Sequence, residues 1–183
     1  MKKLFGYLKT VFIHKWWVFY YACALDIPWR GFLHDFSKLS PCELFENVKY
    51  YDGKQSPVIN CKLQNGYSKA WLHHRGHNRH HYEYWYDNFD KGGHANIMPY
   101  AETIEMLCDY FAAGRTYQKK DFSYLNEYQW WINKKSDIWA MHLVQKLFIT
   151  QSLGYAAGHN APPPKKLLKE YYTNLRKAYE NDN

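Results

Sequence analysis

Apolar residues recur along this chain at helical spacing, and very little of the chain alternates with the period of a strand. The pattern predicts a first helix from about Lys2 to Cys23, which we expect to be a buried amphipathic helix of the domain. A turn around Asp26-Ile27-Pro28 follows, because proline disfavours continuation of a helix. A second, short helical segment then carries Trp29 to Phe36.

Start and stop signals predict the later helices. Ser40, Pro41 and Glu43 form a capping box that opens a helix to Tyr50 or Tyr51. We expect Ser136 to cap a later helix and Gly154 to end it. The other predicted helical ranges are Asn60 to His74, Tyr82 to Trp85, Pro99 to Ala113, Asp121 or Ser123 to Lys134, and Lys165 to Glu180. The predicted loops are Asp52 to Pro57 and Asp90-Lys91-Gly92-Gly93.

These elements define an all-α protein of 183 residues, a length that fits one domain with a sizeable core. We assign residues 1–158 to the helical domain. Residues 159–183 form a charged C-terminal helix that is separated by Pro162-Pro163-Pro164. Because this tail is more polar, we expect it to pack loosely.

Composition narrows the class of protein. Aromatic residues make up 20% of the chain, which argues against disorder, and the net charge of +7 favours an anionic partner such as a phosphate ester, nucleotide, nucleic acid or acidic lipid. The four cysteines form no CxxC pair, which excludes a zinc ribbon and indicates reduced, mostly buried thiols in a cytoplasmic protein. Lys9, His14 and Lys15 interrupt the first apolar run, so we expect neither a signal peptide nor a membrane partner.

The histidines are unevenly placed. Five of the ten lie within the nine residues from His73 to His81. Neutral imidazole is the commonest nitrogen ligand for transition metals, so the cluster is a candidate metal site. A solvated histidine-rich turn explains the cluster equally well. His94, His142 and His159 are better interpreted as structural or surface residues.

Four residues outside the cluster add weight to the metal interpretation. His34 and Asp35 are adjacent, and adjacent residues reach one ion only at the end of a helix. His14 and Asp109 lie in apolar stretches, where an unpaired carboxylate is costly. One shared metal ion would account for all four residues.

The order of His14, His34-Asp35, a histidine cluster and Asp109 resembles the HD-domain superfamily of helical metal-dependent phosphohydrolases. In that family the first histidine, the His-Asp pair and the late aspartate bind one metal ion. In two-metal branches the aspartate of the pair bridges, and intervening histidines hold the second ion. The resemblance implies an HD-domain-like helical bundle with the metal site in its core. The implied metal ligands are His14, His34, Asp35, His74, His80, His81 and Asp109.

The segment from His34 to Lys38 is similar to the His-Asp-x-Gly-Lys motif of the branch that opens cyclic dinucleotides, but the Gly-Tyr-Pro element of that branch is absent. The similarity implies that Lys38 contacts a phosphate. More closely, Ala70 to His74, Asn78 to Trp85 and Glu105 to Asp109 resemble a phage and bacterial family without an assigned activity. A phage-encoded member would act in the host cytoplasm.

The resemblance implies a metal-dependent phosphohydrolase or phosphodiesterase that acts on a nucleotide or cyclic nucleotide through a metal-activated hydroxide. Two divalent ions are expected, from among Mn, Fe, Co, Zn and Mg. Asp35 and Lys38 are the candidate catalytic residues, and the candidate substrate-binding residues are Lys38, Arg75, Asn78 and Arg79. Glu43 is either a proton shuttle or only the capping residue. The alternatives are an HD-type di-iron oxygenase and a basic nucleic-acid-binding module.

Overall fold

The chain is almost entirely helical, as the computed structural model of the protein shows for residues 1–87 and 92–181. The all-α prediction is confirmed. The α-helices of these residues are α1 (Lys2–Ala24), α2 (Pro28–Leu33), α3 (Pro41–Tyr50), α4 (Pro57–Asn65), α5 (Lys69–His77), α6 (Tyr100–Gln118), α7 (Tyr124–Lys134), α8 (Leu143–His159) and α9 (Lys165–Asn181). Short 3-10 helices span Phe36–Leu39, Tyr82–Trp85 and Lys119–Asp121, and β1 (Tyr86–Asp87) pairs antiparallel with β2 (His94–Ala95).

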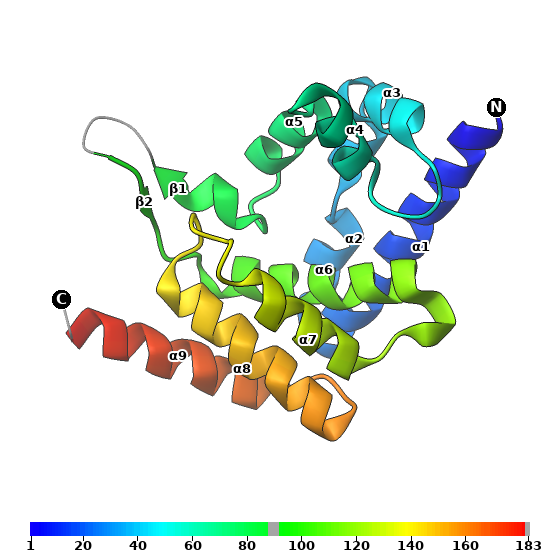
Figure 1. The fold of residues 1–183 in the computed structure, drawn as a ribbon. Coiled ribbons are helices and arrows are strands. Elements are labelled where there is room, and N and C mark those ends of the chain that lie inside the picture. The colour runs from blue at the N-terminus through cyan, green and yellow to red at the C-terminus, as the bar shows by residue number, and fades with distance from the viewer. Residues whose placement is uncertain (88–91, 182–183) are drawn as a thin grey trace.

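Helix α6 is the central element of the molecule. The long helix α1 packs along it, and the short helix α2 packs against α1. Helices α3, α4 and α5 form a group on one side, whereas α7 and α8 pair on the other side with α9 lying along α8 (Figure 1). The core between these layers is apolar and aromatic, with Tyr21, Leu107, Phe111, Trp131 and Phe148 all fully buried.

Prolines and serines begin several of the helices, although the start at Pro57 falls within a segment that we predicted to be a loop. Pro28, Pro41 and Pro57 each occupy the first position of a helix, where the missing N–H costs no hydrogen bond. Ser68 and Ser123 cap α5 and α7, and each hydroxyl accepts a 3.0 Å hydrogen bond from the backbone N–H three residues later. The predicted starts at Pro41 and Ser123 are therefore confirmed.

The sequence-based boundaries are wrong for three of the predicted helices. The predicted helix from Asn60 to His74 is two helices, because Gly66 adopts a left-handed conformation (φ +77°) that ends α4, and Ser68 then starts α5. The helix predicted to start at Ser136 begins instead at Leu143, capped by His142, and it runs through Gly154 to His159. Helix α6 extends five residues past Ala113, to Gln118.

The C-terminal helix packs closely against the rest of the molecule, contrary to our expectation. Leu168 is fully buried and Tyr172 is 7% exposed. The Tyr172 hydroxyl donates a 2.7 Å hydrogen bond to the backbone carbonyl of Met98. One apolar face of the charged helix α9 is enough to hold it on the core.

Two further expectations concern the cysteines and a loop. Cys61 and Cys108 are buried, but Cys23 and Cys42 are exposed, so only half of the thiols behave as buried apolar groups. Asp90 and Lys91 of the predicted loop lie outside the described residues. Within the described ranges, no helix is both long and apolar enough to cross a membrane.

Glu127 on α7 is buried against α6 and carries an expected pH dependence. A Cβ atom at Gly114 would lie 2.2 Å from Glu127 Oε1, so only glycine at that position lets the carboxyl group come this close. Burial raises the pKa of Glu127 to about 7, although a hydrogen bond from Gln118 opposes the shift. Because the folded-state pKa lies above the unfolded value, its contribution to stability is complete below about pH 4.5 and is lost as the pH rises through 7.

We therefore expect Glu127→Gln to remove this pH dependence. Relative to the variant, the wild type should lose about 2 kcal/mol of unfolding free energy between pH 5 and pH 8. Urea unfolding at both pH values measures the difference. The exposed Glu170→Gln variant serves as the control and should behave like the wild type, and equal pH dependence in Glu127→Gln and wild type would contradict the prediction.

Candidate metal centre

The end of α2 delivers His34 and Asp35 to the centre of the site. His34 leaves the helix with an extended conformation, and Asp35 takes a left-handed conformation with φ 55°. Aspartate tolerates this region better than most residues do. Helix α2 can lie close to α1 because of Gly31, where a Cβ atom would come within 2.4 Å of the Ala22 Cβ. The left-handed conformation of Asp35 turns the chain sharply at the end of α2. Because adjacent residues within a helix do not share a face, this turn lets both His34 and Asp35 reach the same site.

One carboxylate oxygen of Asp35 faces the histidines of α1 and α2. Asp35 Oδ2 lies 3.2 Å from His34 Nε2 and 3.8 Å from His14 Nε2. Asp109 on α6 completes this group, with its Oδ1 3.0 Å from His14 Nε2 and 3.6 Å from His34 Nε2. These four side chains bring donor atoms within 4.8 Å of one another.

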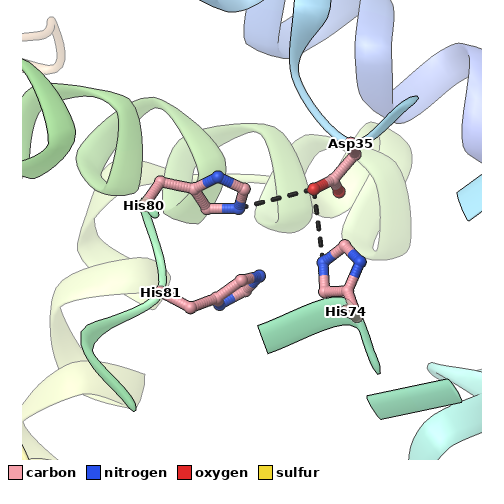
Figure 2. A group of neighbouring side chains, drawn as sticks. All are labelled: Asp35, His74, His80 and His81. Atoms are coloured by element: carbon pink, nitrogen blue, oxygen red, sulfur yellow. Dashed lines mark ion pairs between the residues drawn. The ribbon is translucent and has the colours of Figure 1, made fainter. Parts of the chain in front are cut away.

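The other carboxylate oxygen of Asp35 faces the histidine cluster. Asp35 Oδ1 lies 3.2 Å from His74 Nε2 and 3.4 Å from His80 Nε2 (Figure 2). The ring of His81 points into the same space, and these four residues form a second group with donor atoms within 4.8 Å. Asp35 is thus shared by two sets of ligand-type side chains, one on each oxygen.

Most of the converging atoms make no hydrogen bond. The buried side-chain atoms without a hydrogen-bond partner among the described residues include His14 Nε2, His34 Nε2, Asp35 Oδ1, His80 Nε2 and His81 Nε2. Buried polar atoms almost always make hydrogen bonds, so five such atoms that lie close together without one require an explanation. Nitrogen and oxygen donors of this kind are suited to a divalent transition metal, and these groups could hold a metal ion.

Two carboxylates outside these groups orient the histidine rings. Glu105 Oε1 accepts a 3.0 Å hydrogen bond from His34 Nδ1 and lies 3.2 Å from His80 Nδ1. Glu43 Oε2 accepts a 2.8 Å hydrogen bond from His74 Nδ1. With Nδ1 occupied in this way, each ring presents Nε2 to the centre, as metal-ligating histidines usually do. Glu105 together with His34 and His80 is better explained as this outer support than as a third metal group.

The ionisation states favour metal binding. Burial lowers the pKa of His14, His80 and His81, which favours the neutral imidazole that binds metals. The pKa of Asp35 is held well below its usual range because neighbouring cationic groups, above all His34 and Lys38, outweigh its burial.

The pKa of the supporting carboxylate Glu105 is lowered, whereas the pKa values of the two rings nearest Asp35, His34 and His74, are raised. Burial works against ionisation of Glu105, but hydrogen bonds from His34 and His80 lower its pKa to about 2. Burial also works against protonation of His34 and His74, yet Asp35 outweighs it and raises the pKa of both rings. Metal binding at those two rings therefore displaces a proton.

A cavity of about 520 Å³ opens onto this centre. His14, His74, His81, Asp109 and Lys38 line it at the centre. Lys38 Nζ lies 2.5 Å from Asp35 Oδ2, which places a cation beside the candidate metal ligands. The rest of the wall mixes aromatic, aliphatic and charged side chains. It includes the aromatic residues Trp71, Tyr82, Tyr110 and Trp130, the cations Lys62 and Lys134, and the acidic residues Glu43, Glu83 and Asp137.

The other candidate substrate-binding residues, Arg75, Asn78 and Arg79, do not line the cavity. Arg79 is half exposed, lies 3.5 Å from the Glu102 carboxylate and stacks on Trp85, and it does not line this cavity. Arg75 is also absent from the described cavity lining. Asn78 donates hydrogen bonds to Ser37 Oγ at 2.8 Å and to the His74 carbonyl at 2.7 Å, so it positions the turn behind the ligands.

Sequence reasoning missed the two supporting carboxylates. Glu105 precedes Asp109 by four residues on α6, and this spacing on one helix face was the available signal. The capping box at Ser40 is wrong, because no side-chain capping hydrogen bond forms there and Glu43 instead binds His73 at 2.7 Å and His74. His73 itself lies outside the two metal groups. His94 is exposed, whereas His142 caps α8 and His159 stacks on Tyr155.

Comparison with known proteins places the chain in a family. Residues 3–154 match the model of a family of unknown function, DUF5662, and the chain belongs to that family. No curated protein matches the chain. No solved structure matches it either. The match covers α1 to α7 and most of α8, and every residue of the candidate metal centre lies within the matched range.

Glu105 and Glu102 offer a matched test of the outer support. Both are buried glutamates on α6, but only Glu105 contacts histidines of the centre, whereas Glu102 contacts Arg30 and Arg79. Glu105→Gln should weaken metal affinity roughly 10- to 100-fold, because the amide no longer holds the two rings as a carboxylate does. Glu102→Gln should bind metal like the wild type. Competition with a chromogenic chelator measures both, and equal affinities for Glu105→Gln and wild type would refute the supporting role.

Proposed function

We propose that this protein is a metal-dependent phosphohydrolase of the HD type that acts on a nucleotide or cyclic nucleotide. The observation that carries the proposal is the convergence of buried imidazole nitrogens, most of them without a hydrogen bond, on the two carboxylate oxygens of Asp35. Residues up to 95 positions apart in the sequence, from His14 to Asp109, contribute to it. That set matches the ordered ligand set of the HD resemblance.

Asp35 would be the shared ligand of two ions. This assignment is supported by its two oxygens, which face different histidines: Oδ2 faces His14 and His34, whereas Oδ1 faces His74 and His80. His81 and Asp109 would complete the two sets. Bound divalent ions, from among Mn, Fe, Co, Zn and Mg, supply an activated water and neutralise phosphoryl oxygens.

Lys38 would bind and orient the phosphate. Its ammonium group lies beside Asp35, and the neighbouring carboxylates Asp35 and Asp109 outweigh its burial and keep its pKa above the usual value. The side chain therefore stays charged at all physiological pH values. A fixed cation next to the reacting centre stabilises the negative charge that develops on the phosphoryl oxygens.

The cavity supports a substrate that combines an anion with a flat ring system. Lys38 supplies the cation beside the candidate ligands, and Trp71, Tyr82, Tyr110 and Trp130 provide aromatic surface. Lys62 and Lys134 also line the wall, where they share it with the acidic residues Glu83 and Asp137. A phosphate held at the ligands and Lys38 leaves these rings to contact the remainder of the molecule. A nucleotide has both parts.

Hydrolysis assays with and without oxygen test the proposal. Purified protein loaded with Mn, Co or Mg should release phosphate, or open a cyclic phosphate, from a member of a nucleotide panel under anaerobic conditions. Asp35→Asn, which keeps a residue that tolerates the left-handed conformation, should lose both metal and activity. The exposed Asp121→Asn variant is the control and should retain both.

Two outcomes of this experiment would overturn the proposal. A protein that binds no metal with His34 and Asp35 intact has no such centre. Two irons with oxygen-dependent turnover would identify an oxygenase, since iron accepts the same imidazole and carboxylate ligands.

Lys38 should affect catalysis without affecting metal loading. Lys38→Gln is expected to lower kcat about 10²-fold, because the ammonium group that stabilises the negative charge on the phosphoryl oxygens is lost. Lys134→Gln, on the wall contributed by α7, should change kcat much less. Steady-state kinetics and metal analysis of both variants decide the point. Full activity of metal-loaded Lys38→Gln would contradict the assigned role.

A further inference from the structure

The side of α1 that faces away from the core is largely apolar, and no other described residue buries its large side chains. Four large aromatic side chains are more than half exposed there: Phe5 is 68% exposed, Phe12 57%, Trp16 64% and Tyr20 55%. Two exposed lysines, Lys2 and Lys9, fall on the same face. These six residues, spaced three or four apart, form one helical stripe, which we call the α1 stripe: Lys2, Phe5, Lys9, Phe12, Trp16 and Tyr20.

The apolar surface continues onto the next two elements of the chain. Trp29 is 77% exposed, Phe32 52%, Leu33 61% and Phe36 47%. The rings of Trp29 and Phe32 are in edge contact, as are those of Phe32 and Phe36. Lys15 of α1 joins the two parts, because its Nζ lies 4.1 Å from the centre of the Phe36 ring. Helices α1 and α2 lie side by side (Figure 1).

This face is larger than an ordinary surface patch. If each large side chain offers about 200 Å², the exposed fractions sum to on the order of 900 Å² of mostly apolar surface. The largest patch of a typical monomer covers roughly 300–600 Å² and is often functional. A face of this size is therefore a candidate interaction surface.

Charge identifies the kind of partner. The segment from Met1 to Leu25 contains no aspartate or glutamate, and the whole chain carries a net charge of +7. Lys2 and Lys9 alternate with Phe5 and Phe12 in the N-terminal half of the α1 stripe, so two copies of the chain meeting through this half would bring like charges together. Lysine interleaved with tryptophan, tyrosine and phenylalanine suits the headgroup region of an anionic bilayer, where rings insert and ammonium groups stay at the phosphates.

We propose that the α1 stripe, with Trp29, Phe32, Leu33 and Phe36, docks on an anionic lipid surface, so that α1 lies in the plane of the interface. The absence of a spanning helix led us to expect no membrane partner, but peripheral docking needs no such helix. The opposite face of α1 carries Tyr7, Val11 and His14 to the cavity. Docking through the stripe therefore leaves the cavity uncovered, and this inference is independent of the proposed function.

Sedimentation with vesicles tests the proposal on the full chain. The wild type should bind phosphatidylcholine vesicles that contain phosphatidylserine at least about tenfold more tightly than phosphatidylcholine alone, and high salt should weaken that binding. The double variant Phe12→Ser with Trp16→Ser should lose about tenfold in affinity, and so should Lys2→Glu with Lys9→Glu. The control pair Phe45→Ser with Leu63→Ser, at equally exposed positions on α3 and α4, should bind like the wild type.

A second measurement needs no substitution. Brominated lipids in the same vesicles should quench tryptophan fluorescence of the wild type, because Trp16 and Trp29 enter the interface. Lack of vesicle binding, lack of quenching, or an equal loss in the control pair would overturn the proposal. A dimer that dissociates when Phe12 and Trp16 are replaced would also overturn it, since a second copy would then cover the face.

Discussion

The negative charge of Asp35 is the constraint on which the arrangement of the N-terminal two thirds of the molecule depends. Its carboxylate is almost completely buried, and a buried carboxylate must be compensated by cations and hydrogen bonds. Histidines from α1, from the end of α2 and from the α5 turn surround it, and Lys38 lies beside it. Removing that charge would take away the carboxylate that faces the Nε2 atoms of His34, His74 and His80. The helix ends are therefore positioned by electrostatics as much as by the apolar core.

The same principle extends outward by one layer. Glu43 and Glu105 are buried carboxylates that face histidines on one side, and Glu105 also accepts a 2.9 Å hydrogen bond from Arg30. Charges alternate from Arg30 to Glu105 to the histidines to Asp35. Such an alternating network fixes ring orientation before any ligand arrives, which is the condition for precise geometry at a reactive centre.

The sequence predicted the helical class and the ligand-type residues because both depend on local patterns and on residue chemistry. Periodicity located α1 and α6, and the adjacency of His34 and Asp35 required a helix end, which the structure has. Helix boundaries that depend on tertiary packing were missed. Gly154 remains helical within α8, where it packs beside Tyr128, and no helix begins at Ser136. Glu105 and Glu43 were missed as supports because their partners are 25 to 71 residues away in sequence, a relation that no local spacing encodes.

The position of the donors along the chain has a consequence for folding. A single ion held by His14, His34, Asp35 and Asp109 would cross-link α1, the end of α2 and α6, and would close chain loops of 20 and 74 residues. Because these donors come together only in the folded arrangement, the binding free energy of the ion adds to the free energy of unfolding, and the ion would act as a reversible cross-link in the first two thirds of the molecule. Helices α7 to α9 contribute no donor to these groups, and they are attached by apolar packing and by hydrogen bonds such as the one from Tyr172 to the Met98 carbonyl. Metal loading would thus make the part of the chain from α1 to α6, which holds the ion, more resistant to unfolding than helices α7 to α9.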